Sequence, residues 1–334
     1  MKKNRVTLKN LAQQLGLSIS TISKALNNSP EISEETKKKV LDKADELGYR
    51  SNAGIEHGHK TIAVLLPDIK NDFFAQVLTG LEGVASEKGF KIITCLTNES
   101  YKKEVDYLST LSKETIDGFI IAAAQETQQL ERYDHFQNLI DADVPLVMFD
   151  RVIDEMECDK IVIDDYQSGA RAVDALIDSG DRNIGMVSLT STLSVSRLRE
   201  QGIRNQMAKY DDAIFNVITC DDEQVFLDRV GDALSYDGVQ SIIALDQISG
   251  KLALNKAMEL GKKIPDDLQI ISYSDGILSN YSRPKISVMD QHAEELGKKT
   301  FVRMQNLINN KDEVKVTRIH TLRTSLIRRE TTRN

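Results

Sequence analysis

Hydroxyl groups, an ammonium group and an apolar side chain gather in one short segment near the start of this chain. They are Ser18, Ile19, Ser20, Thr21 and Lys24. Hydroxyl and ammonium groups can hydrogen-bond to phosphate oxygens and base edges, and a short apolar side chain can contact a thymine methyl group. No Asp or Glu occurs in residues 1–30. The segment therefore suits contact with a polyanion such as DNA.

Two short helices joined by a tight turn are expected to position these side chains. Apolar residues recur at helical spacing on both sides of the turn: Leu8, Leu11, Ala12, Leu15, Ile22, Ala25 and Leu26. Gly16 should end the first helix, because a residue without Cβ turns the chain at little steric cost. Ser18 should cap the second helix by accepting from its first backbone N–H groups. This pattern predicts a helix-turn-helix, whose second helix enters the major groove.

The charge distribution supports a nucleic-acid-binding N-terminal domain. Residues 1–60 contain eleven Lys or Arg and seven Asp or Glu, whereas the whole chain has a net charge of −8. A basic domain on an acidic body is typical of a DNA-binding module joined to a domain with another role. The alternative is a small helical bundle with a solvated basic face.

A third helix is expected after Ser33, with Glu34 and Glu35 in its first turn and Gly48 at its end. With this helix, the stretch VTLKNLAQQLGLS and the residues up to ELGY resemble the DNA-binding domain of the lactose-repressor (LacI/GalR) family of bacterial transcription regulators. The resemblance implies double-stranded operator DNA as a partner. The residues expected to contact it are Thr7, Ser18, Ile19, Ser20, Thr21, Lys24, Asn27, Asn52 and Ile55.

The segment 51–60 corresponds to the hinge of that family and departs from it. The family has a proline here and a leucine that inserts into the minor groove, whereas this chain has Gly54, Gly58 and no proline. Each glycine weakens a helix by about 1 kcal/mol relative to alanine. We therefore expect no stable hinge helix away from DNA, and Ile55 is the candidate for the inserted side chain.

From Thr61 onward, short apolar runs alternate with amphipathic helical patterns. Eleven strands are expected, at 61–67, 90–96, 118–124, 144–150, 160–164, 183–189, 214–219, 239–246, 268–274, 285–290 and 316–322. Continuous apolarity is typical of parallel strands covered on both faces. The number of strands exceeds one open sheet and favours two lobes.

The predicted fold class is therefore α/β, with an all-α N-terminal domain and a two-lobed, doubly wound parallel-sheet core. The expected domains are a DNA-binding domain (1–50), a hinge linker (51–60) and the core (61–334). Within the core, the first lobe is expected at about 61–160 plus 290–320 and the second at about 161–285. Segments such as VPLVMFDR and IPDDLQIISYSD resemble the periplasmic-binding-protein-like core of the same family.

A ligand cleft is expected between the lobes, at the carboxyl ends of the strands. The resemblance implies a small polar effector, such as a sugar or a sugar derivative, and a homodimer. The residues expected to bind the effector are Phe73, Phe74, Asp150, Arg197, Asp246, Ser274 and Asp275. Two departures concern the effector: Asp246–Gln247 replaces the usual Asn-Asp, and Ser274 replaces a common carboxylate.

Composition limits the other function classes. Three scattered cysteines without CxxC spacing indicate reduced thiols and no metal site, and no apolar run is long enough to span a membrane. With no export signal, a cytoplasmic protein is expected. There is no phosphate-binding loop, nucleophile elbow or paired acid and base, so neither a cofactor nor an enzymatic activity is expected.

The chain ends without a heptad repeat, which favours a dimer over a tetramer. A solute-binding or sensing module and an α/β enzyme remain the alternatives.

Overall fold

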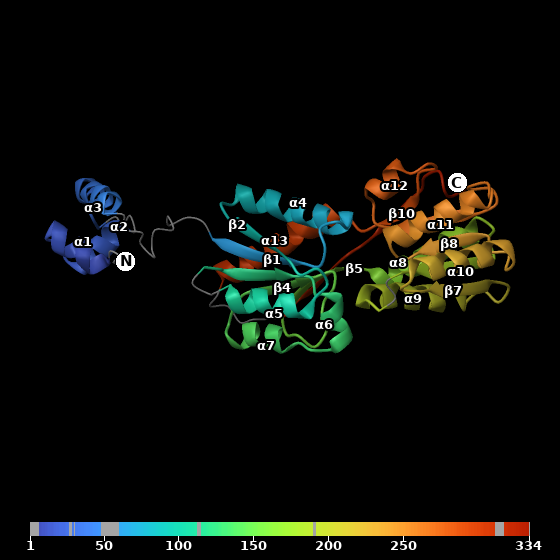
Figure 1. Ribbon diagram of the computed structural model, residues 1–334, viewed down its shortest axis with the longest axis horizontal. Coiled ribbons are helices and arrows are strands. Elements are labelled where there is room, and N and C mark those ends of the chain that lie inside the picture. Colours follow the sequence, from blue (N-terminus) through green and yellow to red (C-terminus); the bar gives the residue numbers. More distant parts are fainter. Residues whose placement is uncertain are drawn as a thin grey trace. The chain divides into compact units, whose positions relative to one another are not determined.

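The computed structural model describes residues 7–26, 29, 31–47, 60–111, 115–189, 192–310 and 317–333. It contains two compact units, an N-terminal helical domain and an α/β core, and each is described by itself (Figure 1). Asn27, Asn52, Ile55 and nearly all of the expected hinge lie outside the described residues. Within the described part, no helix is both long and apolar enough to cross a membrane.

The N-terminal domain consists of three helices, α1 (Leu8–Leu15), α2 (Ile19–Leu26) and α3 (Glu34–Glu46). Gly16 lies at the end of α1 with φ = 64°, the left-handed conformation expected for the turn. The helices enclose a small apolar core, formed by Leu11, Ala12, Ile22, Ala25, Val40 and Ala44. The spacing of these residues in the sequence therefore produces the expected helix-turn-helix.

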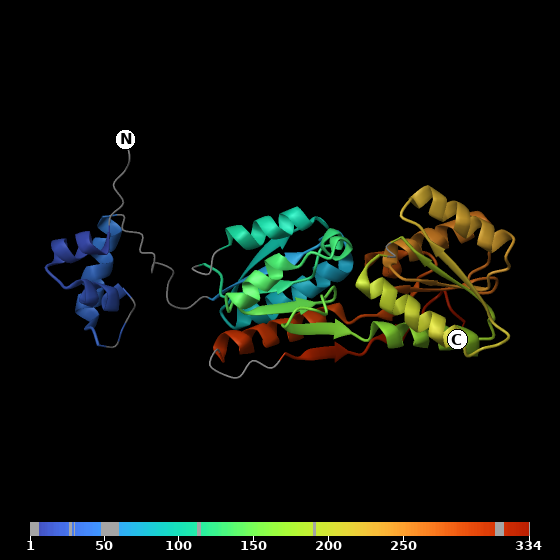
Figure 2. The ribbon, with the colours of Figure 1, turned by 90° about the horizontal axis from the view of Figure 1, so that it is seen from below.

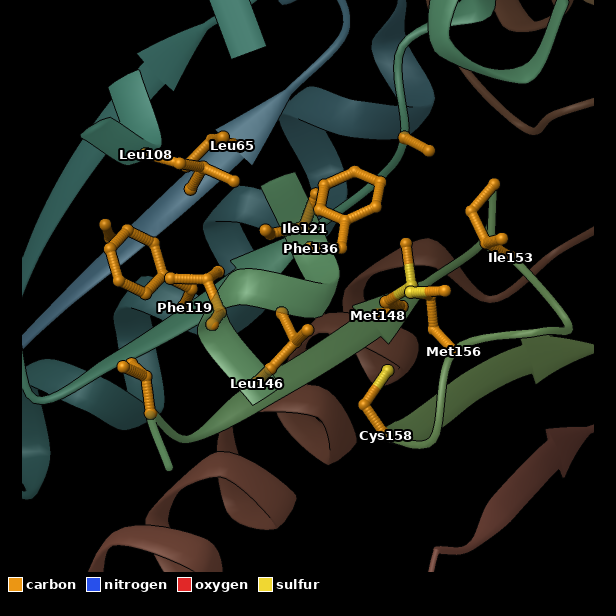
Figure 3. Packing of buried hydrophobic residues seen from close by; sticks show 14 of the residues in the cluster. Leu65, Leu108, Phe119, Ile121, Phe136, Leu146, Met148, Ile153, Met156 and Cys158 are labelled. Atoms are coloured by element: carbon orange, nitrogen blue, oxygen red, sulfur yellow. The ribbon is translucent and has the colours of Figure 1, made fainter. Parts of the chain in front are cut away.

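The first lobe of the core is built on a six-stranded sheet with the order β11-β5-β4-β3-β1-β2. Its strands are β1 (Thr61–Leu66), β2 (Lys91–Leu96), β3 (Gly118–Ile121), β4 (Leu146–Phe149), β5 (Asp159–Ile163) and β11 (Ile319–Leu322). The pairs from β11 to β1 are parallel. One face carries α4 (Asp72–Glu87) and α13 (Ala293–Asn309), and the other carries α5 (Tyr101–Thr110), α6 (Gln125–Leu130) and α7 (Asp134–Asp141). Side chains such as Phe119, Phe136 and Met148 fill the layer beneath α5 and α7 (Figure 3).

The second lobe has the same layered architecture. Its sheet order is β12-β10-β9-β8-β6-β7, and only β12 runs antiparallel to its neighbour among the pairs described. The strands are β6 (Asn183–Ser188), β7 (Ile214–Thr219), β8 (Ser241–Ala244), β9 (Gln269–Tyr273), β10 (Ser287–Asp290) and β12 (Ser325–Ile327). The helices α8 (Asp165–Asp178) and α9 (Ser194–Met207) cover one face, and α10 (Glu223–Ser235) and α11 (Gln247–Glu259) cover the other. A short helix, α12 (Ile277–Tyr281), follows β9.

The expected lobe boundaries need correction at three places. Strand β5 pairs with β4 and β11 and so belongs to the first lobe, whereas β10 pairs with β9 in the second. Although they come late in the chain, β11 is an edge strand of the first sheet and α13 lies against that sheet, as the red segments in Figure 2 show. The chain then returns to the second lobe to form β12, a strand that sequence analysis missed. At three residues, β12 is too short to show an apolar pattern.

Candidate DNA-contacting surface and ligand pocket

The outer face of α2 presents the side chains expected to contact DNA. Ile19 is 50 % exposed although it is apolar, and Ser20 and Lys24 are also exposed. Ile22 and Ala25, on the opposite face, are buried in the core of the domain. An exposed isoleucine between exposed polar groups at the start of a helix fits a surface that contacts base edges.

Two of the expected contact residues already hold the backbone in place. Ser18 Oγ accepts a hydrogen bond from the backbone N–H of Thr21 at 3.0 Å, so it caps α2. Thr7 and Asn10 form a capping box at the start of α1. Both hydroxyl groups therefore fix helix ends, whatever else they contact.

Lys24 forms an ion pair that sequence analysis did not anticipate. Its Nζ lies 2.5 Å from Glu31 Oε2, and both side chains are largely exposed. The hydrogen bond and the positive charge of Lys24 lower the pKa of Glu31. Contact with a DNA base would require Lys24 to exchange this carboxylate partner for a base acceptor.

A pocket of about 380 Å³ lies between the two lobes of the core. Phe73 and Phe74, at the start of α4, form an apolar wall on the side of the first lobe, and Asp150 follows β4. The second lobe contributes the start of α11 and the residues after β9, including Asp246 and Ser274. The pocket thus lies at the carboxyl ends of strands from both sheets, as expected for open α/β sheets.

Arg199 on α9 is a buried cation in the wall of this pocket. Its Nε donates to Asp165 Oδ1 at 2.6 Å and its Nη1 donates to the carbonyl of Leu245 at 2.8 Å. The guanidinium also lies over the ring of Tyr273, 4.1 Å from its centroid. These contacts hold a rigid donor group in the wall of the pocket.

Asp150 lies in the pocket without a hydrogen-bond partner for its carboxylate among the described residues. The residue is 7 % exposed, and its φ of 53° places it in the left-handed region. Burial raises its pKa, although the charges of Arg151 and Arg199 act in the opposite direction. A buried polar group without a partner is suited to receive a ligand.

The structure does not bring two of the expected effector-binding residues to the pocket. Arg197 is exposed, and Arg199 occupies the wall instead. Two residues along a helix correspond to a rotation of about 200°, so the two arginines lie on nearly opposite faces of α9. Asp275 accepts from Arg329 at 2.6 Å and from Asn280 at 2.7 Å, outside the pocket. The other five expected residues line the pocket: Phe73, Phe74, Asp150, Asp246 and Ser274.

Several pocket residues were missed at the level of sequence. Arg151 donates from Nη1 to both oxygens of Glu99 at 2.7 Å, and both residues line the pocket. Gln247 and Gln291 are also buried at its wall. The sequence offered one hint of the Arg151–Glu99 pair, namely that Arg151 directly follows Asp150. Glu99 comes from a loop that is distant in the sequence.

Comparisons with known proteins agree with both units. Residues 7–52 match the family described as bacterial regulatory proteins, lacI family, and residues 173–332 match the periplasmic binding protein-like domain. The chain is 26 % identical to the HTH-type transcriptional repressor PurR of Vibrio vulnificus over 337 residues, which cover 97 % of this chain and 98 % of that one.

Two solved structures are also similar. A LacI family transcriptional regulator from Enterococcus faecium with bound ribose has a TM-score of 0.70 and 25 % identity, covering 82 % of this chain and 98 % of that one. The lac repressor dimer bound to operator has a TM-score of 0.76 at 19 % identity, covering 98 % and 99 %. The second likeness concerns the fold alone.

Proposed function

Since this chain belongs to the lacI family of bacterial regulatory proteins, DNA-binding regulators of transcription, we propose that it is a repressor whose affinity for its operator changes when a small polar effector enters the pocket. The observation that carries the proposal is the presence, in one chain, of an exposed α2 face and a polar pocket between two lobes.

The proposed role of the pocket rests on its position between the two lobes of the core. A ligand that contacts both lobes stabilises the arrangement in which both sets of contacts form. If that arrangement favours or disfavours DNA binding, the two sites are coupled energetically, typically by 1–3 kcal/mol. In a dimer, each N-terminal domain would read one half-site of a near-palindromic operator, as the lac repressor dimer bound to operator suggests. Asn27, Asn52 and the insertion of Ile55 remain predictions.

A carbohydrate-like effector suits the lining of the pocket. Phe73 and Phe74 supply an apolar wall, while Asp150, Ser274 and Arg199 supply hydrogen-bond acceptors and donors. This combination matches the alternating C–H and O–H surface of a sugar. The ribose bound to the Enterococcus faecium relative supports the same class.

We further propose that the protein acts in the cytoplasm and has no catalytic role, since the relatives named above are transcriptional regulators. The alternative is a solute-binding module without an operator. A gel-shift assay with a library of genomic fragments in the presence of excess nonspecific DNA separates the two. Selective retardation of a few fragments supports the regulator, and uniform or absent retardation supports the alternative.

A further inference from the structure

We propose that the effector donates a hydrogen bond to Gln247 Oε1, and that the excess of acidic side chains around the pocket selects an uncharged, hydroxyl-rich ligand over its phosphate ester. This inference rests on the proposed function, because it assumes that the effector binds between the lobes.

The orientation of the Gln247 amide follows from a chain of three groups. The backbone N–H of Phe73 can only donate, and it donates to Asn71 Oδ1 at 3.1 Å. Because Asn71 Oδ1 is thereby fixed as an acceptor, the amide of Gln247 that contacts it at 3.0 Å must present Nε2. Asn71 precedes α4 in the first lobe and Gln247 begins α11 in the second, so this hydrogen bond joins the lobes.

The same geometry leaves Gln247 Oε1 without a partner. Gln247 is 8 % exposed, and its Oε1 is buried and accepts no hydrogen bond from any described residue. A buried acceptor left unpaired costs about 1–3 kcal/mol. A ligand that donates to this oxygen would remove that cost, whereas a phosphate or carboxylate oxygen, which is itself an acceptor, would not.

The charges around the pocket oppose an anionic ligand for a second reason. Arg199 and Arg151 each have an internal carboxylate partner, Asp165 and Glu99 respectively. Asp246 caps α11 through Ser249 and also lines the wall. Counting Asp165 behind Arg199, five acidic and three basic side chains surround the cavity: Asp68, Glu99, Asp150, Asp165, Asp246, Lys70, Arg151 and Arg199.

The hydroxyl groups of a sugar can satisfy both the acceptors and the donor in this wall. One hydroxyl can donate to Gln247 Oε1 or to Asp150, and another can accept from Arg199, whose Nη2 is not used by any described residue. A donor seated on Gln247 would also hold the amide in the orientation that bonds Asn71. The effector would in this way stabilise the hydrogen bond from Gln247 to Asn71, which joins the lobes.

The test compares free sugars with their phosphates on the full-length chain. The probes are D-ribose, D-glucose and D-fructose at equal concentration with D-ribose 5-phosphate, D-glucose 6-phosphate and D-fructose 6-phosphate, and the readout is the melting temperature. A free sugar should raise it, and its phosphate should not. Stabilisation by a phosphate at least equal to that by the free sugar would overturn this inference but leave the proposed effector site standing. Stabilisation by none of the six would contradict both.

Substitutions at Gln247 test the residue itself. Gln247→Met keeps the length and removes both polar atoms, so the stabilising sugar should bind about tenfold more weakly by calorimetry. Gln247→Glu keeps one oxygen toward the pocket but replaces the Nε2 donor with a second acceptor, which faces Asn71 Oδ1. This substitution should also weaken binding of the sugar. The matched control is Gln224→Met, at an exposed glutamine in the first turn of α10 that bonds Asp228. Unchanged affinity in both Gln247 variants would refute the assignment.

Discussion

Arg199 and Asp165 form a buried ion pair in the wall of the pocket, with 2.6 Å between Nε and Oδ1. Both side chains are at most 6 % exposed. The pair joins α9 to the start of α8. Arg199 also donates to the carbonyl of Leu245, the residue directly after β8. Three elements of the second lobe therefore meet at the group that we expect to face the effector.

Replacing Arg199 should disturb both stability and effector binding. Arg199→Ala leaves Asp165 buried without its partner, which should lower the free energy of unfolding by about 3–5 kcal/mol. Arg197→Ala on the exposed face of α9 should change it by less than about 0.5 kcal/mol. Denaturant titration followed by circular dichroism measures both. Equal effects of the two substitutions would contradict the placement of Arg199.

A double variant separates lost binding from lost stability. Asp165→Asn combined with Arg199→Met removes both charges and should recover much of the stability lost in Arg199→Ala. It should still fail to bind the effector, because the guanidinium donors are gone. Calorimetric titration with the stabilising sugar reports this, and normal affinity in the double variant would show that Arg199 does not contact the ligand.

The carboxyl of Asp165 should make stability depend on pH in an unusual direction. Burial raises its pKa from an ordinary value near 3.8 to about 6, despite the charge of Arg199. The folded chain thus holds this proton more tightly than the unfolded chain. The associated stability is present below about pH 4 and is lost as the pH rises from about 4 to about 6. The melting temperature of the wild type should therefore fall over this range relative to that of Asp165→Asn, and a constant difference would refute the assignment.

Two glycines of α4 should respond oppositely to the same substitution. A Cβ at Gly80 would lie 2.0 Å from the carbonyl oxygen of Glu294 on α13, whereas a Cβ at Gly83 would meet nothing within 4 Å. Gly80→Ala should cost about 1–3 kcal/mol because the helices must separate. Gly83→Ala, in the same helix and exposed, should gain about 0.5–1 kcal/mol. Denaturation of both variants side by side checks the close packing of α4 against α13.

Two lysines of the N-terminal domain should affect DNA binding in different ways. Lys24→Ala should change the preference among operator variants by about 1–3 kcal/mol at particular base pairs. Lys9→Ala, on the exposed surface of α1, should weaken binding to all sequences alike. A panel of operator variants at fixed salt measures this. Unchanged discrimination by Lys24→Ala would mean that this face of α2 does not read bases.

Local sequence signals predicted most of the fold. All eleven expected strands are present, because continuous β-branched and apolar runs suit strands covered on both faces. Gly89, Gly180 and Gly261 each come two residues after the last residue of a helix, and all three have positive φ values. Strand β12 was missed because three residues and an antiparallel pairing leave no periodic signal.

The site was predicted less completely, for a related reason. Residues at the carboxyl ends of strands, such as Asp150 and Ser274, reach the pocket because topology alone places them there. Arg197 and Arg199 both lie on α9, and the packing of Arg199 against Asp165 and Leu245 from other elements decides which of the two reaches the pocket. The orientation of the Gln247 amide depends on a contact with Asn71 from the other lobe, which no local pattern reveals.

Coupling between the pocket and DNA tests the central claim most directly. The full-length chain is used to select its preferred site from genomic fragments, and its affinity for that site is measured with and without the sugar that stabilises the core. The selected site should contain two related half-sites, and the sugar should change the affinity at least fivefold, the lower end of typical allosteric coupling. An affinity that stays the same at saturating sugar would contradict a ligand-responsive regulator.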